Sequence, residues 1–230
     1  KSSAKRSELA VDLIVGASRE AARLPPLLLL REELRPAHAL AMFWWCGHQE
    51  RRQILVRFSA ERTQLIENCA DIFSRVHGQT VSDPVLALAL QVIERRQRNR
   101  GAIQHTRFPS LEAAVEEAAR RGLDRQLADT LSLLSGVKAA TGVKIFSDVG
   151  GEGVAVLCKA TGLKRQWLKA LWVALRRTGP GDDERFARVS DIFETLPVAK
   201  AQTVLRYWDW RLSAAFTLDD ADGSSSLAGG

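Results

Sequence analysis

The stretch AERTQLIENCADIFSRV, residues 60–76, decides the fold class, because its apolar residues recur at steps of three and four. This spacing places the apolar side chains on one stripe of an α-helix and leaves the charged side chains for the opposite face. Similar patterns predict further helices at residues 8–24, 37–45, 48–58, 85–97, 110–121, 124–134, 152–160, 163–177, 183–194 and 198–216.

The breaks between these segments fall at residues that end or begin helices. We expect Pro25-Pro26 to end the first helix, because a residue before proline avoids the α region. Pro36 is expected in a first helical turn, and Gly162 as a left-handed C-terminal cap. Strand signals are nearly absent, since residues 143–146 are the one short β-favouring run and fit a helix end equally well. The sequence therefore predicts an all-α fold.

The predicted helices form hairpins that echo one another. Residues 41–43 with 54–58 resemble residues 191–193 with 204–208, although any two helical hairpins look alike at this level. Paired hairpins are the unit of helical-repeat stacks, so we expect stacked helical hairpins, in either a HEAT-like or an irregular helical bundle. The longest non-periodic stretch suggests four parts: an N-terminal helical subdomain (1–97), a connector (98–109), a C-terminal helical subdomain (110–216) and a flexible acidic tail (217–230).

Composition excludes several classes of protein. The 230 residues are 46% apolar and 26% charged, which is typical of globular chains and unlike disordered or collagen-like ones. Three cysteines are too few for a disulfide-stapled secreted module. The longest conspicuous apolar run, residues 27–30, is far too short to span a membrane. We therefore expect a cytoplasmic protein that makes no membrane contact.

The usual catalytic and metal-binding motifs are missing from the sequence. It contains no G-x-S-x-G and no H-E-x-x-H, and the glycine-rich residues 150–153 lack the Lys-Ser/Thr pair of a phosphate loop. Those glycines more plausibly break a helix, with Glu152 favoured near the next helix N-terminus. Cys46 and His48 form one close ligand pair, whereas a structural zinc site needs four ligands. We expect a protein without enzymatic activity, bound metal or cofactor. The open alternative is an active site assembled from residues that are distant in the sequence.

Positive charge gathers in two places along a chain whose net charge is +6. On the predicted helix 163–177, Arg165, Lys169 and Arg176 share a face, and Trp172 lies at its edge. The second cluster is opposed only by Glu94 and contains Arg95, Arg96, Arg98, Arg100 and Arg107. Arginines in such clusters can grip anionic groups in a bidentate fork. The competing interpretation is a solvated helix face.

These observations favour a non-catalytic interaction or scaffold module that binds an acidic protein partner through a basic and aromatic surface. The predicted partner-binding residues are Arg165, Lys169, Trp172, Arg176, Arg95, Arg96 and Arg98. The alternative is a nucleic-acid-binding protein, in which residues 153–177 form a helix-turn-helix-like unit and the basic helix 163–177 enters a groove. The sequence leaves the oligomeric state open.

Three groups of short stretches carry a family resemblance. They are residues 35–45 (RPAHALAMFWW) with 51–58 (RRQILVRF), residues 151–157 (GEGVAVL) with 159–163 (KATGL), and residues 193–206 (FETLPVAKAQTVLR). In these stretches the chain resembles the DUF2336 family, a group of mainly alphaproteobacterial proteins, over roughly residues 20–216. The resemblance implies a helical, repeat-like domain in a bacterial cytoplasm, and it implies no chemistry.

Overall fold

The computed structural model describes residues 2–59, 98–175 and 181–209. The helices predicted at residues 60–76 and 85–97 and the predicted tail lie outside these ranges. All regular secondary structure within the described ranges is helical, without a strand, so the all-α fold class is confirmed. The repeat character stays a prediction.

The N-terminal part corrects one expected boundary. Its helices are α1 (Ser2–Ala17), α2 (Leu24–Leu28), α3 (Pro36–Met42) and α4 (His48–Arg57). The prediction that Pro25-Pro26 ends the first helix is wrong, because α1 ends at Ala17 and both prolines lie in the first turn of α2. A first-turn N–H has no intrahelical acceptor, so proline loses nothing there. The same reasoning correctly places Pro36 at the start of α3.

The C-terminal part is a set of helices, of which α8 and α9 begin at side-chain caps. In order they are η1 (Arg100–His105), α8 (Leu111–Arg121), α9 (Arg125–Leu134), α10 (Ala139–Ser147), α11 (Glu152–Thr161), α12 (Arg165–Ala174), α13 (Asp182–Thr195) and the helical residues 198–209. The Ser110 hydroxyl accepts the Ala113 N–H at the start of α8, and Asp124 accepts the Leu127 N–H at the start of α9. Residues 143–146 lie within α10, so the helical alternative holds there.

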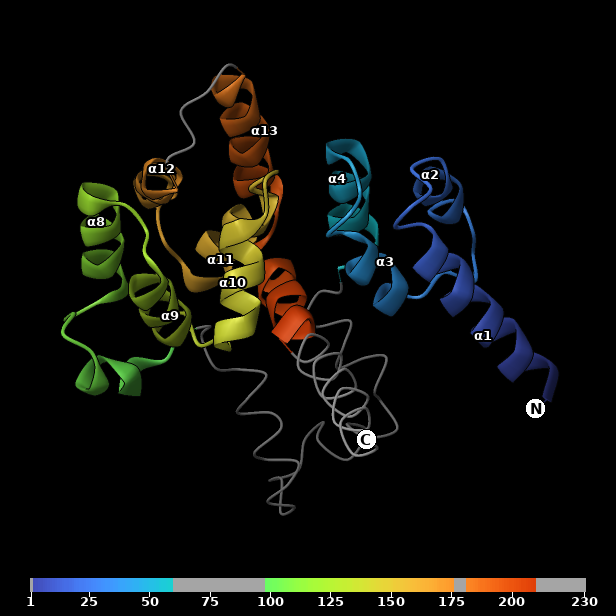
Figure 1. Ribbon diagram of the computed structural model, residues 1–230, viewed down its shortest axis with the longest axis horizontal. Helices are drawn as coiled ribbons and strands as arrows, with labels where there is room; N and C mark the ends of the chain where they lie inside the picture. Colours follow the sequence, from blue (N-terminus) through green and yellow to red (C-terminus); the bar gives the residue numbers. More distant parts are fainter. Residues whose placement is uncertain (1, 60–97, 176–180, 210–230) are drawn as a thin grey trace, which may run out of the picture.

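Helix α11 is the central element of this part. Its residues are buried along nearly the whole length, and it packs against α10, α12 and α13. In Figure 1, α8, α9 and α12 lie on one side of α11, and α1 to α4 lie on the other. A helix that is buried on all sides is expected to be apolar around most of its circumference. The α11 sequence fits this expectation.

The two parts of the chain contact each other through aromatic rings. The buried Trp208 indole N–H donates to the Leu40 carbonyl over 3.1 Å, and the Trp208 and Trp44 ring centroids lie 4.6 Å apart. The hairpin α3–α4 therefore packs against the one formed by α13 and residues 198–209, which are the two hairpins that resemble each other in sequence. These contacts cross the predicted connector, 98–109, and the division into subdomains stays a prediction.

Candidate functional site

Helix α12 begins after a turn that requires one residue in a left-handed backbone conformation. The turn comprises residues 162–164, and its Gly162 has a left-handed conformation with φ of 72°. The Gly162 N–H donates to the Lys159 carbonyl and the Leu163 N–H to the Cys158 carbonyl, which closes the end of α11. Glycine adopts positive φ without steric cost. The observed φ and the two hydrogen bonds confirm the predicted cap at Gly162.

The inner face of α12 is apolar and fixes the direction of the outer face. Leu168 and Leu171 are at most 1% exposed, and α12 packs against α8, α11 and α13. Trp172 is 6% exposed, and its ring centroid lies 5.5 Å from that of Phe186 in α13. The expectation that Trp172 lies at the edge of the binding surface is therefore wrong. Helix α13 packs against α12 and places Phe186 beside the indole, so Trp172 belongs to the core.

The outer face of α12 carries its charges near the N-terminal end. Its exposed residues there are Lys164, Arg165, Gln166 and Lys169, which we call the α12 basic face. Arg165 is 64% exposed at its side chain and lies 3.8 Å from a Glu194 carboxylate oxygen, whereas Lys164 and Lys169 have no ion-pair partner within the described ranges. An exposed pair at that distance contributes at most about 1 kcal/mol. The Arg165 guanidinium can therefore exchange Glu194 for another anion.

The second predicted cluster is altered by a carboxylate from another helix. The Arg98 Nη2 and Nη1 atoms donate to Glu112 of α8, over 2.7 and 3.1 Å, and its Nε donates to the Thr161 carbonyl. The Arg98 hydrogen bond is the main cause that lowers the pKa of Glu112, so this carboxylate is charged at neutral pH. The prediction that Glu94 alone opposes this cluster is therefore wrong, because Glu112, near the start of α8, forms an ion pair with Arg98.

The predicted partner-binding residues are thus only partly brought together. Arg165 and Lys169 share the α12 basic face, Trp172 lies beneath it, and Arg98 is engaged with Glu112. The remaining three, Arg95, Arg96 and Arg176, lie outside the described residues.

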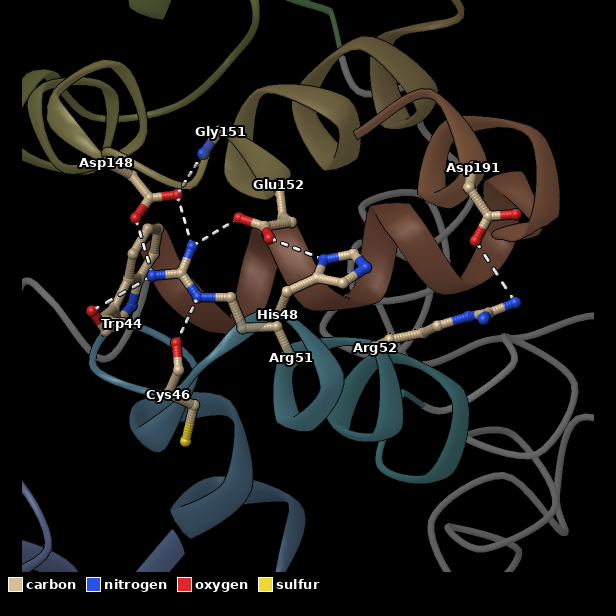
Figure 2. Close-up of polar contacts among 9 residues, drawn as sticks. All are labelled: Trp44, Cys46, His48, Arg51, Arg52, Asp148, Gly151, Glu152 and Asp191. Carbon is tan, nitrogen blue, oxygen red and sulfur yellow. Dashed lines mark hydrogen bonds and ion pairs between the residues drawn. The ribbon is translucent and has the colours of Figure 1, made fainter. Parts of the chain in front are cut away.

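A buried polar network, absent from the sequence-based expectations, joins α4 to the start of α11 (Figure 2). Arg51 is 6% exposed, and its Nη1 and Nη2 each donate to a different Asp148 oxygen over 2.8 Å. Its Nη1 also donates to Glu152 over 2.7 Å, and its Nε donates to the Cys46 carbonyl over 2.9 Å. His48 Nδ1 lies 3.0 Å from the other Glu152 oxygen, Oε1. These partners leave Arg51 surrounded by acceptors.

The network is charged despite its burial. Burial alone favours the neutral form of Glu152, but the Arg51 charge and the His48 hydrogen bond outweigh it and lower the pKa of this carboxyl. Burial likewise favours a neutral Arg51, but hydrogen bonds and charge from Asp148, followed by Glu152, raise its pKa. Both partners therefore remain ionised at neutral pH. The expected place of Glu152 near a helix N-terminus is confirmed, since it is the first residue of α11.

Cys46, His48 and Glu152 together look like the residue types of a cysteine-hydrolase triad, but the chemistry does not fit. Burial, aided by Glu50, raises the pKa of the Cys46 thiol to about 12, so the thiolate is scarce at neutral pH. Figure 2 shows the Cys46 sulfur directed away from the His48 ring. The geometry instead fastens α4 to the junction between α10 and α11, which holds the two parts of the chain together.

The described residues offer neither a metal site nor a membrane-spanning helix. No three His, Cys, Asp or Glu side chains come together there in a way that could hold a metal ion. Among the described helices, none has both the length and the apolar character that crossing a bilayer requires.

Comparison with known proteins identifies a family. The model of a family described as an uncharacterised protein conserved in bacteria (DUF2336) matches residues 2–206, which is most of the chain. No curated protein and no solved structure matches it.

Proposed function

We propose that this chain, which belongs to the DUF2336 family of bacterial proteins, is a non-catalytic interaction or scaffold module that binds an acidic protein partner through the α12 basic face. One observation carries the proposal: Arg165 and Lys169 lie exposed one helical turn apart, on a helix whose opposite face is buried. A cytoplasmic location belongs to the same proposal. It is supported by the free thiols of Cys46 and Cys158, which are typical of reducing compartments.

The charges around the α12 basic face favour an acidic protein over a long polyanion. The helices that pack against α12 carry exposed acids, Glu116 on α8 and Glu194 on α13. A nucleic-acid duplex laid across α12 would bring its continuous phosphates toward Glu194, which lies 3.8 Å from Arg165. A protein partner with a short acidic segment can meet Arg165 and Lys169 and avoid the flanking acids, which is how charge complementarity selects a partner.

The rigidity of the site supports a binding role. Leu168 and Leu171 anchor α12 in the core, and its first residue follows a turn closed by backbone hydrogen bonds. A surface that is already ordered loses less conformational entropy when a partner binds. Binding free energy is therefore not consumed by ordering the helix.

Affinity capture from native bacterial lysate, treated with nuclease, tests the proposal. The bait is the full chain, compared with the double variant Arg165→Glu/Lys169→Glu and the charge-preserving control Arg165→Lys/Lys169→Arg. We expect the control to retain a specific acidic protein and the charge-reversed variant to lose it, with both variants unfolding at the temperature of the original chain. Equal capture by all three baits would overturn the proposal.

Nucleic-acid binding is the second candidate, and the α11–α12 arrangement favours it. The Gly162 turn places Lys164, Arg165 and Gln166 at the exposed start of α12. Residues at the start of a recognition helix are the ones that contact base edges in helix-turn-helix proteins. This candidate predicts that the affinity for a mixed-sequence duplex falls steeply between about 50 and 200 mM salt. The absence of any fluorescence-anisotropy change at the lower salt concentration would remove it.

A further inference from the structure

A cavity of about 560 Å³ lies beside the connector, and its lining extends to Gly162 in the turn before α12. It is bounded by η1, the start of α8, the ends of α9 and α11, and the start of the helical residues 198–209. This volume falls within the range of about 300–1,000 Å³ that is typical of small-molecule sites. None of the four residues of the α12 basic face lines it.

Much of the cavity wall is aliphatic. Leu111 and Leu134 are 4% and 2% exposed and provide a fixed apolar surface, since each is held in the core. Ile103 and Val198 also line the cavity and are 37% and 46% exposed. Covering the exposed portions of these two side chains with an apolar ligand would remove them from water, which contributes favourably at about 25 cal/mol per Å².

The charged residues that the structure describes in the wall are both positive. Among the described residues that line the cavity, Arg98 and Arg100 are the charged ones and no acid is present. Glu112 neutralises Arg98 and, with the Thr161 carbonyl, fixes its guanidinium in place. Arg100 is exposed and has no ion pair within the described ranges. Among the lining residues that the structure describes, the unbalanced charge is therefore that of Arg100.

We propose that this cavity binds a small organic anion, whose acidic group pairs with Arg100 and whose apolar body lies against Leu111, Leu134, Ile103 and Val198. A carboxylate and a phosphate monoester share the chemistry that an arginine recognises. An apolar wall next to one uncompensated cation selects an amphipathic anion over either an inorganic anion or a neutral apolar molecule.

Isothermal titration calorimetry on the full chain tests this site with octanoate, octyl phosphate, 1-octanol and inorganic phosphate. We expect saturable binding of octanoate, octyl phosphate or both, and the better of the two identifies the acidic group. 1-Octanol should bind at least about tenfold more weakly, because it forgoes a charge-assisted hydrogen bond. Inorganic phosphate should give no saturable heat.

Two arginine variants provide the matched comparison. Arg100→Gln should weaken binding about tenfold. Arg107→Gln should leave it unchanged, because Arg107 lies over the Phe108 ring on the same connector and does not line this cavity. Circular dichroism should show the same helix content for both variants as for the original chain. The proposal is overturned if neither organic anion binds, if 1-octanol binds as tightly as the anions, or if the two arginine variants behave alike.

Discussion

Arg51 and Asp148 form a two-bonded ion pair inside the protein, with Nη1 to Oδ2 and Nη2 to Oδ1 both at 2.8 Å, although they lie 97 residues apart in the chain. Arg51 belongs to α4, and Asp148 caps the end of α10. The Asp148 carboxylate also accepts the Gly151 N–H over 3.0 Å, just before α11 begins. The Arg51 side chain thus connects the N-terminal helices to the junction between α10 and α11.

Replacing Arg51 should destabilise the protein severely. In Arg51→Gln, the Asp148 and Glu152 carboxylates stay buried without their cation, which costs about 3–5 kcal/mol. The neighbouring Arg52 offers a matched control, because it is 54% exposed and lies 3.3 Å from Asp191. Arg52→Gln should cost less than about 1 kcal/mol. Urea unfolding measures both free energies, and similar losses for the two variants would contradict the account.

Stability should fall in acid because of Glu152. Burial opposes its charge, but Arg51 and His48 keep the pKa of Glu152 below its ordinary value of 4.5 in the folded protein. A carboxyl with a lowered folded pKa stabilises the protein above its unfolded pKa, and this contribution disappears as the pH falls through the folded value. Urea unfolding from pH 7 to pH 3 should therefore show a steeper loss for the original chain than for Glu152→Gln. Glu112, whose pKa is also lowered, contributes equally to both curves. Parallel curves would exclude this role of Glu152.

Glycine at position 150 should be required by the same network. A Cβ added there would overlap Glu152 Oε2 and the Arg51 Nη1 atom. Gly150→Ala should therefore cost about 1–3 kcal/mol, as overpacking does. Gly16→Ala is the control, because a Cβ at that helical position meets no atom within 4 Å. It should be neutral or stabilising by up to about 1 kcal/mol. Thermal unfolding distinguishes the two, and a shift of the same sign in both would be the contrary result.

Trp172 should matter for stability rather than for binding. Trp172→Ala removes a 6% exposed indole from between neighbouring helices and should cost about 3–5 kcal/mol. Lys169→Ala, one turn earlier on the exposed face, should change stability by no more than about 0.5 kcal/mol. Urea unfolding again provides the comparison. A Trp172→Ala protein as stable as Lys169→Ala would place the indole at the surface after all.

The sequence predicts well those features whose cause is local. The spacing of apolar residues and the Gly162 turn each depend on a few neighbouring residues, and each is found as expected. The end of α1 is missed because a proline pair fits either after a helix or within a first turn, and the sequence alone does not choose between them.

The rest depends on which helices become neighbours. Arg51 meets Asp148 and Glu152 across 97 and 101 residues, and no local pattern links them. Trp172 is buried because α12 packs against three helices, which the periodicity of α12 cannot show. The carboxylate that neutralises Arg98 likewise comes from helix α8. The candidate site therefore contains fewer exposed, available residues than the sequence predicts, because Trp172 is buried and Arg98 is paired with Glu112.

Site-specific photo-cross-linking in living cells tests the central claim most directly. A benzoylphenylalanine at position 166 lies within the α12 basic face, and one at position 53 lies on the exposed side of α4 as a control. We predict that position 166 alone yields an adduct with a protein, that the cross-linked peptide is rich in Asp and Glu, and that Arg165→Glu/Lys169→Glu abolishes it. An adduct at position 166 that survives this charge reversal, or no protein adduct there at all, would contradict the account.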